Sequence, residues 1–220
     1  MKKSFLVTAA FVTSLTAAQA QSPDFRLPLK TTFDAFDTTY TNQEAKISLS
    51  NKLVLIAKKW PSEWSTNYYA AYSRVQLSYN DKLDANKRDA YLDEAENYRD
   101  ETVKLLGKDN SETYALSAMI ANGRLSVNGQ ARWQKYGKIF DDNLESAKKL
   151  NPDNPRVYLL RGISKFFTPK MFGGGKKAAM PYFEKAETLF AQEKNDDITK
   201  PYWGRGMNSF FIKQASGNEE

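Results

Sequence analysis

Apolar residues recur along this chain at steps of three and four, in segment after segment, and this period constrains the fold more than any other feature. Apolar and polar residues nowhere alternate for the length of a strand. Steps of three and four place side chains on one face of an α-helix, whereas a strand needs a step of two. The sequence therefore predicts an all-α protein.

Residues that begin and end helices divide the chain into segments. Pro61 ends one helix because proline disfavours helical geometry in the preceding residue, and Gly107 ends another because glycine accepts a left-handed conformation. Residues 109–111 cap the next helix, and Pro155 suits a first helical turn. The expected apolar faces cover residues 32–40, 45–60, 64–79, 91–105, 115–125, 133–150, 155–166, 179–190 and 201–211.

The connections between these segments are short, so each helix must turn back on its neighbour. The expected architecture is a row of about four antiparallel helix hairpins followed by a terminal helix. Three second helices share a large residue followed by alanine, at Leu92/Ala95, Leu144/Ala147 and Phe183/Ala186. This pattern favours a helical repeat, or solenoid. Ordinary amphipathic helices without a true repeat are the alternative.

The closing part of the chain resembles exported tetratricopeptide-repeat-like (TPR-like) proteins of Bacteroidetes. Within residues 154–186, an Asn-Pro-Arg segment, a Thr-Pro pair at 168 and a Phe-Gly-Gly-Gly loop at 172 carry the resemblance. The repeat spacing exceeds the usual length of about 34 residues, and the Trp-Leu-Gly signature of first helices is missing. The resemblance implies a TPR-like superhelix that acts as a protein-interaction scaffold, with no assigned reaction or cofactor.

The first 20 residues have the pattern of a secretory signal peptide. Lys2 and Lys3 precede an uncharged, mostly apolar run over 5–15, and a small-x-small sequence ends at Ala20. The run is about half the ~20 residues that cross a bilayer, so a retained anchor is the weaker interpretation. We expect cleavage after Ala20, a TPR-like helical domain over 21–220, and a periplasmic or secreted protein without a membrane span.

The chain contains neither histidine nor cysteine. This excludes a Ser-His-Asp triad, a cysteine nucleophile and a zinc site built on thiolate or imidazole. The net charge is +6, but the lysine pairs are far apart and mixed with acids, which does not favour nucleic-acid binding. We predict a protein that is not an enzyme and that needs no cofactor or metal.

Three short motifs have a structural explanation that outweighs the chemical one. The Gly-rich run with lysines at 173–177 follows a helix, whereas a phosphate-binding loop follows a strand; we interpret it as a tight connector with Phe172 in the core. Ser146 and Lys149 match a Ser-x-x-Lys pattern by chance. Acidic pairs such as Asp141-Asp142 lack the loop that calcium requires.

Aromatic residues make up 13% of the chain, and most of them must fill the core. In a superhelical array the first helix of each pair lines the concave side, where cations beside aromatic rings hold carboxylates or extended peptides. The expected groove residues are Tyr69, Arg74, Asn122, Arg124, Arg156, Arg161 and Lys165.

These observations predict an envelope scaffold that binds a protein or peptide partner through a concave helical groove. A receptor for a glycan or small solute, which uses stacked aromatic rings, is the alternative. A hydrolase with a pair of carboxylates is a weaker third hypothesis, because sequence spacing does not set the separation of the two groups.

Overall fold

The computed structural model describes residues 24–217, and this part of the chain contains nine α-helices, one short 3-10 helix and no strand. The predicted all-α fold is confirmed. The predicted signal peptide lies outside the described residues. The helices are α1 (Arg26–Thr38), α2 (Gln43–Lys59), α3 (Trp64–Ser78), α4 (Ala85–Leu106), α5 (Ser111–Val127), α6 (Gly129–Leu150), α7 (Pro155–Phe167), η1 (Lys170–Phe172), α8 (Lys176–Phe190) and α9 (Arg205–Ser216).

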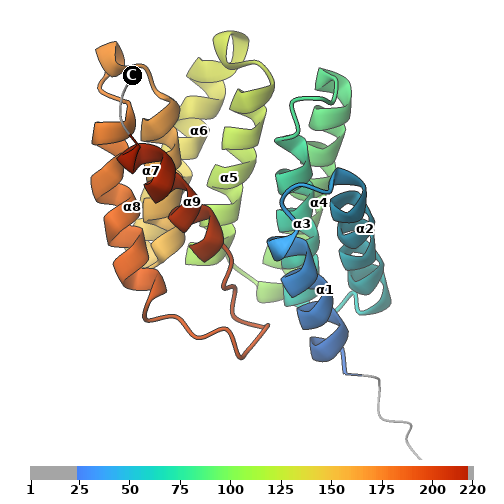
Figure 1. The fold of residues 1–220 in the computed structure, drawn as a ribbon. Coiled ribbons are helices and arrows are strands. Elements are labelled where there is room, and N and C mark those ends of the chain that lie inside the picture. Colours follow the sequence, from blue (N-terminus) through green and yellow to red (C-terminus); the bar gives the residue numbers. More distant parts are fainter. Residues whose placement is uncertain (1–23, 218–220) are drawn as a thin grey trace, which may run out of the picture.

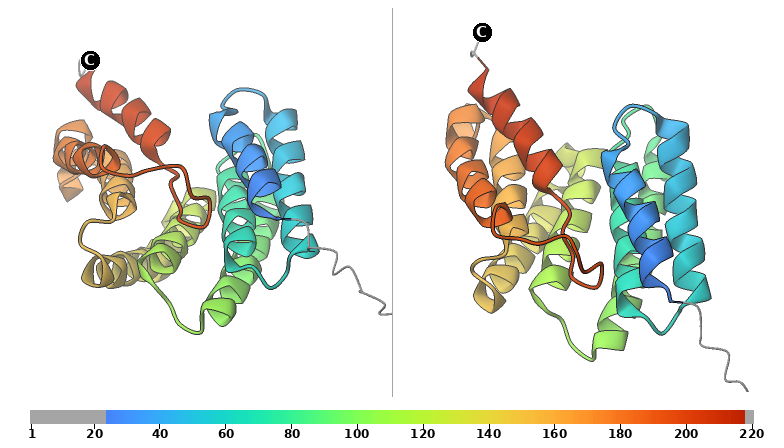
Figure 2. Two further views of the ribbon diagram at one scale, coloured as in Figure 1. Left: turned by 90° about the horizontal axis from the view of Figure 1, so that it is seen from below. Right: turned by 60° about the horizontal axis from the view of Figure 1, so that its bottom comes forward.

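The helices form four antiparallel hairpins that stack side by side, and α9 lies across the last of them (Figure 1). The first helices α1, α3, α5 and α7 contact one another in turn and form an inner layer. The second helices form the outer layer, where Arg132 of α6 pairs with Asp89 of α4 at 2.7 Å. The two further views show the stack curving around the segment that joins α8 to α9 (Figure 2). The expected row of hairpins with a terminal helix is therefore confirmed.

Asparagine and aspartate side chains begin most of these helices. Asn42, Asp84, Asn110, Asn128 and Asn154 each accept a hydrogen bond from a backbone N–H of the first turn. Such caps satisfy donors that have no partner within the helix. The predicted caps before α5 and α7 are confirmed, as is the left-handed conformation of Gly107 after α4, with φ 74°.

The repeated large and small residues lie where the two helices of a hairpin, or of neighbouring hairpins, approach each other. Leu92 and Phe183 are fully buried, and each faces a glycine of a first helix. A Cβ atom built on Gly123 would lie 2.6 Å from Leu92, and one on Gly162 would lie 2.5 Å from Phe183. The glycines thus make room for the large residues that the sequence pattern marks.

Two local predictions are wrong. The last helix begins at Arg205 rather than Pro201, because Gly204 has a φ of 107° that a helix does not allow. Phe172 is 69% exposed rather than buried. The glycine loop folds back on α7, with Gly175 N donating to Lys165 O at 2.8 Å, and the 3-10 turn η1 leaves Phe172 on the surface.

Within residues 24–217 no helix is both long and apolar enough to cross a bilayer.

Candidate binding site

The concave side of the stack is filled by the chain itself. We call residues 191–204, which join α8 to α9, the closing segment. Its Ile198 and Trp203 are buried, with exposed fractions of 2% and 0%. The closing segment is hydrogen-bonded to side chains of α1, α3 and α7.

Trp203 packs among tyrosines of α3. Its ring centroid lies 4.8 Å from that of Tyr72, and its indole N–H donates to the Tyr68 hydroxyl at 2.7 Å. Tyr68 in turn donates to Glu112 at 2.9 Å. Burial raises the pKa of both tyrosines well above the usual range. Neither hydroxyl therefore ionises to an extent that would serve as a base near neutral pH.

Arg156 is the charged centre of this interior and is fully buried. Its Nη1 pairs with Glu193 at 2.7 Å and with Glu112 at 3.3 Å, and its Nη2 donates to Pro201 O at 2.6 Å. The guanidinium also lies 5.2 Å from the ring centroid of Trp203. Arg156 thus ties the closing segment to α5 and α7 by charge and by ring contact.

Glu112 is the buried partner of this cation. Burial raises the pKa of its carboxyl group, while Arg156 and the hydrogen bonds from Tyr68 and Asn154 oppose that shift. Asn154 donates to Glu112 at 2.9 Å from the start of α7. Glu112 thus receives a cation from α7 and hydrogen bonds from α3 and from the start of α7.

A hollow of about 270 Å³ remains at the edge of the closing segment, lined by Asp34, Asp37, Thr38, Glu193, Lys194, Asn195, Tyr202 and Arg205. Burial raises the pKa of Asp37, although Tyr72 donates to it at 3.2 Å. Tyr202 donates to Asp34 at 2.7 Å, and Lys30 lies 5.1 Å from the Tyr202 ring centroid. The hollow is lined by acidic and basic side chains, of which Asp34 pairs with Lys30 and Glu193 pairs with Arg156.

Two of the seven predicted groove residues lie together on the concave side. Tyr69 is fully buried and donates to Lys200 O at 3.5 Å, next to the carbonyl that Arg156 binds. Both therefore contact the closing segment. Their contact with a partner stays a prediction.

The other five are dispersed and bonded within the fold. Arg74 pairs with Glu94 on α4, and Arg124 pairs with Asp89, Asp93 and Glu96 of the same helix. Asn122 accepts a hydrogen bond from the Tyr79 hydroxyl. Arg161 pairs with Asp141 on α6, and Lys165 donates a hydrogen bond to Gly173 O. These contacts join neighbouring helices, and they do not form one shared surface.

Sequence reasoning missed the closing segment. Its charges, a proline and a lack of helical period make it look like an exposed linker. The apolar pair Tyr202-Trp203 is a sequence signal for burial, but it follows Pro201 and fits the start of a helix equally well. Within the described residues, no cluster of three or more acidic side chains is placed to hold a metal ion.

Comparison with solved structures finds one informative relative. The HusA haemophore from Porphyromonas gingivalis superposes with a TM-score of 0.74 at 31% sequence identity, over 89% of this chain and 94% of HusA. This chain belongs to the HusA family. No protein-family model matches the chain, and no curated protein matches it either.

The HusA relationship agrees with two of the sequence predictions. Porphyromonas is a genus of the Bacteroidetes, the group to which the closing hairpin pointed. A haemophore is a binding protein, in agreement with the prediction that this chain is not an enzyme. Membership of the TPR family itself stays a prediction.

Proposed function

We propose that this protein is exported and binds a haem-type tetrapyrrole outside the cytoplasm. The observation that carries the proposal is the relationship to a haemophore over nearly the full length of both chains. The predicted signal peptide supports the location, because a haemophore works where its ligand is found. A periplasmic or secreted location is part of the same proposal.

The composition restricts how a tetrapyrrole can be held. With no histidine and no cysteine, the commonest protein ligands of haem iron are absent, and tyrosine, methionine and lysine are what the chain offers. The tyrosines of the concave side are buried and hydrogen-bonded to the protein. We therefore expect the apolar ring to provide most of the binding free energy, and the iron to provide little.

Titration of the mature chain, residues 21–220, tests the proposal. We expect saturable binding of haemin, seen as a shift of its Soret band, with a Kd on the order of micromolar or lower. Metal-free protoporphyrin, followed by its own fluorescence, should bind with similar affinity. The absence of a saturable change with either ligand would contradict the proposal.

A protein or peptide partner in the cell envelope stays a second proposal. Leu27 on α1 and Leu55 on α2 are 73% and 63% exposed, which leaves apolar side chains on the first hairpin available to another protein. A stoichiometric partner captured by wild-type protein, and lost when both leucines are changed to Ser, would support this function. A glycan ligand would instead raise the melting temperature in a thermal-shift screen of sugars.

A further inference from the structure

One end of the molecule exposes several large apolar side chains. We call it the end face, and it consists of Phe166, Phe167, Met171, Phe172, Phe210 and Phe211, from α7, η1 and α9. Phe167, Met171, Phe172 and Phe210 are 69%, 82%, 69% and 54% exposed. A soluble protein exposes such a group mainly where it binds something.

Ring contacts join the α7 and α9 parts of the end face. The Phe211 centroid lies 5.4 Å from Phe166, 6.0 Å from Phe167 and 5.4 Å from Phe210. Beneath them the fully buried Phe183 stacks on Phe211 at 5.5 Å with an interplanar angle of 13°. The exposed rings therefore rest on a rigid, packed base.

The 3-10 turn η1 completes the end face. It is held against α7 by the hydrogen bond from Gly175 to Lys165 O, and Lys176 donates to Gly217 O after α9. Figure 1 shows η1 and the C-terminal end of α9 at the same end of the stack. Beside the turn lies a hollow of about 400 Å³, lined by Lys170, Gly173, Gly174, Gly175, Lys177 and Ala178.

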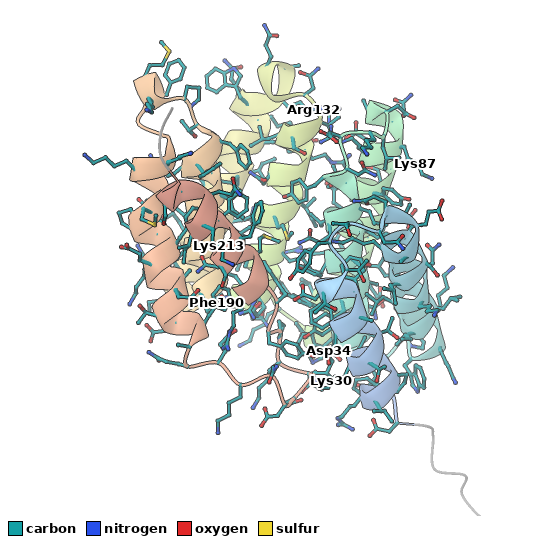
Figure 3. The ribbon with its side chains drawn as sticks, in the orientation of Figure 1. Lys30, Asp34, Lys87, Arg132, Phe190 and Lys213 are labelled. Carbon is teal, nitrogen blue, oxygen red and sulfur yellow. The ribbon has the colours of Figure 1, made fainter. Side chains whose placement is uncertain are left out.

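Within the described residues, the elements that form the end face carry charges of a single sign, and Glu219 and Glu220 follow them in the sequence. No Asp or Glu occurs from residue 154 to 183, or from 198 to 217, and these stretches contain α7, η1, the first half of α8 and α9. Lys177 is exposed at the hollow, and Lys213 is exposed one helical turn after Phe210 (Figure 3). Within the described residues, this apolar surface is bordered by cations, and such a surface is complementary to an apolar ligand that carries carboxylates.

We propose that the end face is the tetrapyrrole site: the ring packs on Phe167 and Phe210, and its two carboxylates pair with Lys177 and Lys213. This inference rests on the proposed function and adds the place and the charge requirement of binding. The concave side is an unsuitable alternative, because Trp203 and Arg156 already fill it.

The first experiment removes the apolar contacts. Phe167→Ala combined with Phe210→Ala should weaken protoporphyrin binding by roughly tenfold or more, because both rings would be covered by the ligand. The matched control is Leu55→Ala combined with Leu150→Ala, two side chains that are 63% and 57% exposed at other places. The control should leave affinity unchanged, and circular dichroism should show both variants folded.

The second experiment tests the charges. Lys177→Glu combined with Lys213→Glu should weaken binding of protoporphyrin by roughly fivefold, a value typical of two exposed ion pairs. The dimethyl ester of protoporphyrin lacks the carboxylates, so its binding should not change. Lys148→Glu combined with Lys149→Glu, an exposed pair at the end of α6, is the control of equal charge.

The outcomes separate this inference from the function on which it rests. If the wild-type protein binds neither haemin nor protoporphyrin, the proposed function fails and the site fails with it. If the wild-type protein binds but both end-face variants bind equally well, only the site is overturned. Wild-type binding to anionic phosphatidylglycerol vesicles that the double alanine variant abolishes, with unchanged porphyrin affinity, would assign the face to lipid and overturn the inference.

Discussion

At the scale of single residues, Arg156 is the side chain whose loss should cost most. Arg156→Ala would leave Glu112 and Glu193 without their shared cation inside the fold. Breaking a buried ion pair by removing one partner costs about 3 to 5 kcal/mol. We expect the free energy of unfolding in urea to fall by about that amount.

Arg161→Ala on the same helix is the control for this prediction. Arg161 pairs with carboxylates that are more than half exposed, and such pairs contribute about 1 kcal/mol or less. Equal losses in the two variants would show that Arg156 is not buried. From the sequence, both arginines are expected to line the groove. Helical periodicity does not reveal which side chains of distant helices contact each of them.

Asp37 is the residue that should make stability depend on pH. Burial raises the pKa of its carboxyl group, with Lys46 and the Tyr72 hydroxyl opposing the shift. The folded protein therefore binds this proton more tightly than the unfolded chain does. Its ionisation costs stability as pH rises through the raised pKa, and that cost is absent below the ordinary value of about 3.9.

Asp37→Asn removes this titration and keeps an oxygen that can accept a hydrogen bond from the Tyr72 hydroxyl. We expect the variant to be more stable than the wild-type protein at pH 7, and this advantage to disappear near pH 4. Urea unfolding of both proteins at several pH values measures the difference. An advantage that grows as pH falls would mean that the pKa shift has the opposite sign.

At the scale of elements, the hairpin α7/α8 depends on a glycine that sequence alone does not distinguish from any other helical glycine. Gly162→Ala improves helix propensity by up to about 1 kcal/mol. The new Cβ, however, would lie 2.5 Å from the Phe183 ring, and overpacking of this kind costs about 1 to 3 kcal/mol. We expect a lower melting temperature.

Gly137→Ala in α6 is the matched change, because a Cβ there would meet no atom within 4 Å. This variant should be more stable by about 0.5 to 1 kcal/mol. If the helix contact decides the effect at Gly162, the melting temperature should fall in the Gly162 variant and rise in the Gly137 variant. A higher melting temperature in both variants would show that α7 and α8 do not approach closely.

The boundaries at Gly107 and Asn110 were predictable because capping residues act locally. The closing segment was not predictable, because Trp203 is buried against Tyr68 and Tyr72, more than a hundred residues earlier in the chain. The prediction that Phe172 is buried was wrong for a related reason. An apolar residue beside a glycine loop can point inward or outward, and the fold of the loop alone decides which.

At the scale of the whole molecule, the closing segment joins the first and last hairpins. Tyr202 contacts Phe33 on α1 with ring centroids 5.2 Å apart, and Arg156 on α7 binds Pro201 O. In an open repeat array each repeat contacts only its neighbours, so the ends can unfold separately. Contacts between the ends make the stack a single cooperative unit.

We therefore expect the wild-type protein to unfold in urea in one transition, with coincident curves from far-UV circular dichroism and tryptophan fluorescence. Ile198→Ala combined with Tyr202→Ala should break the connection between the ends. The two curves should then separate, and the apparent m-value should fall, since less surface is exposed in each step. Phe210→Ala removes an aromatic ring of α9 that does not belong to the closing segment, and it should leave the curves coincident. Separate curves already in the wild-type protein would mean that the closing segment does not couple the two ends.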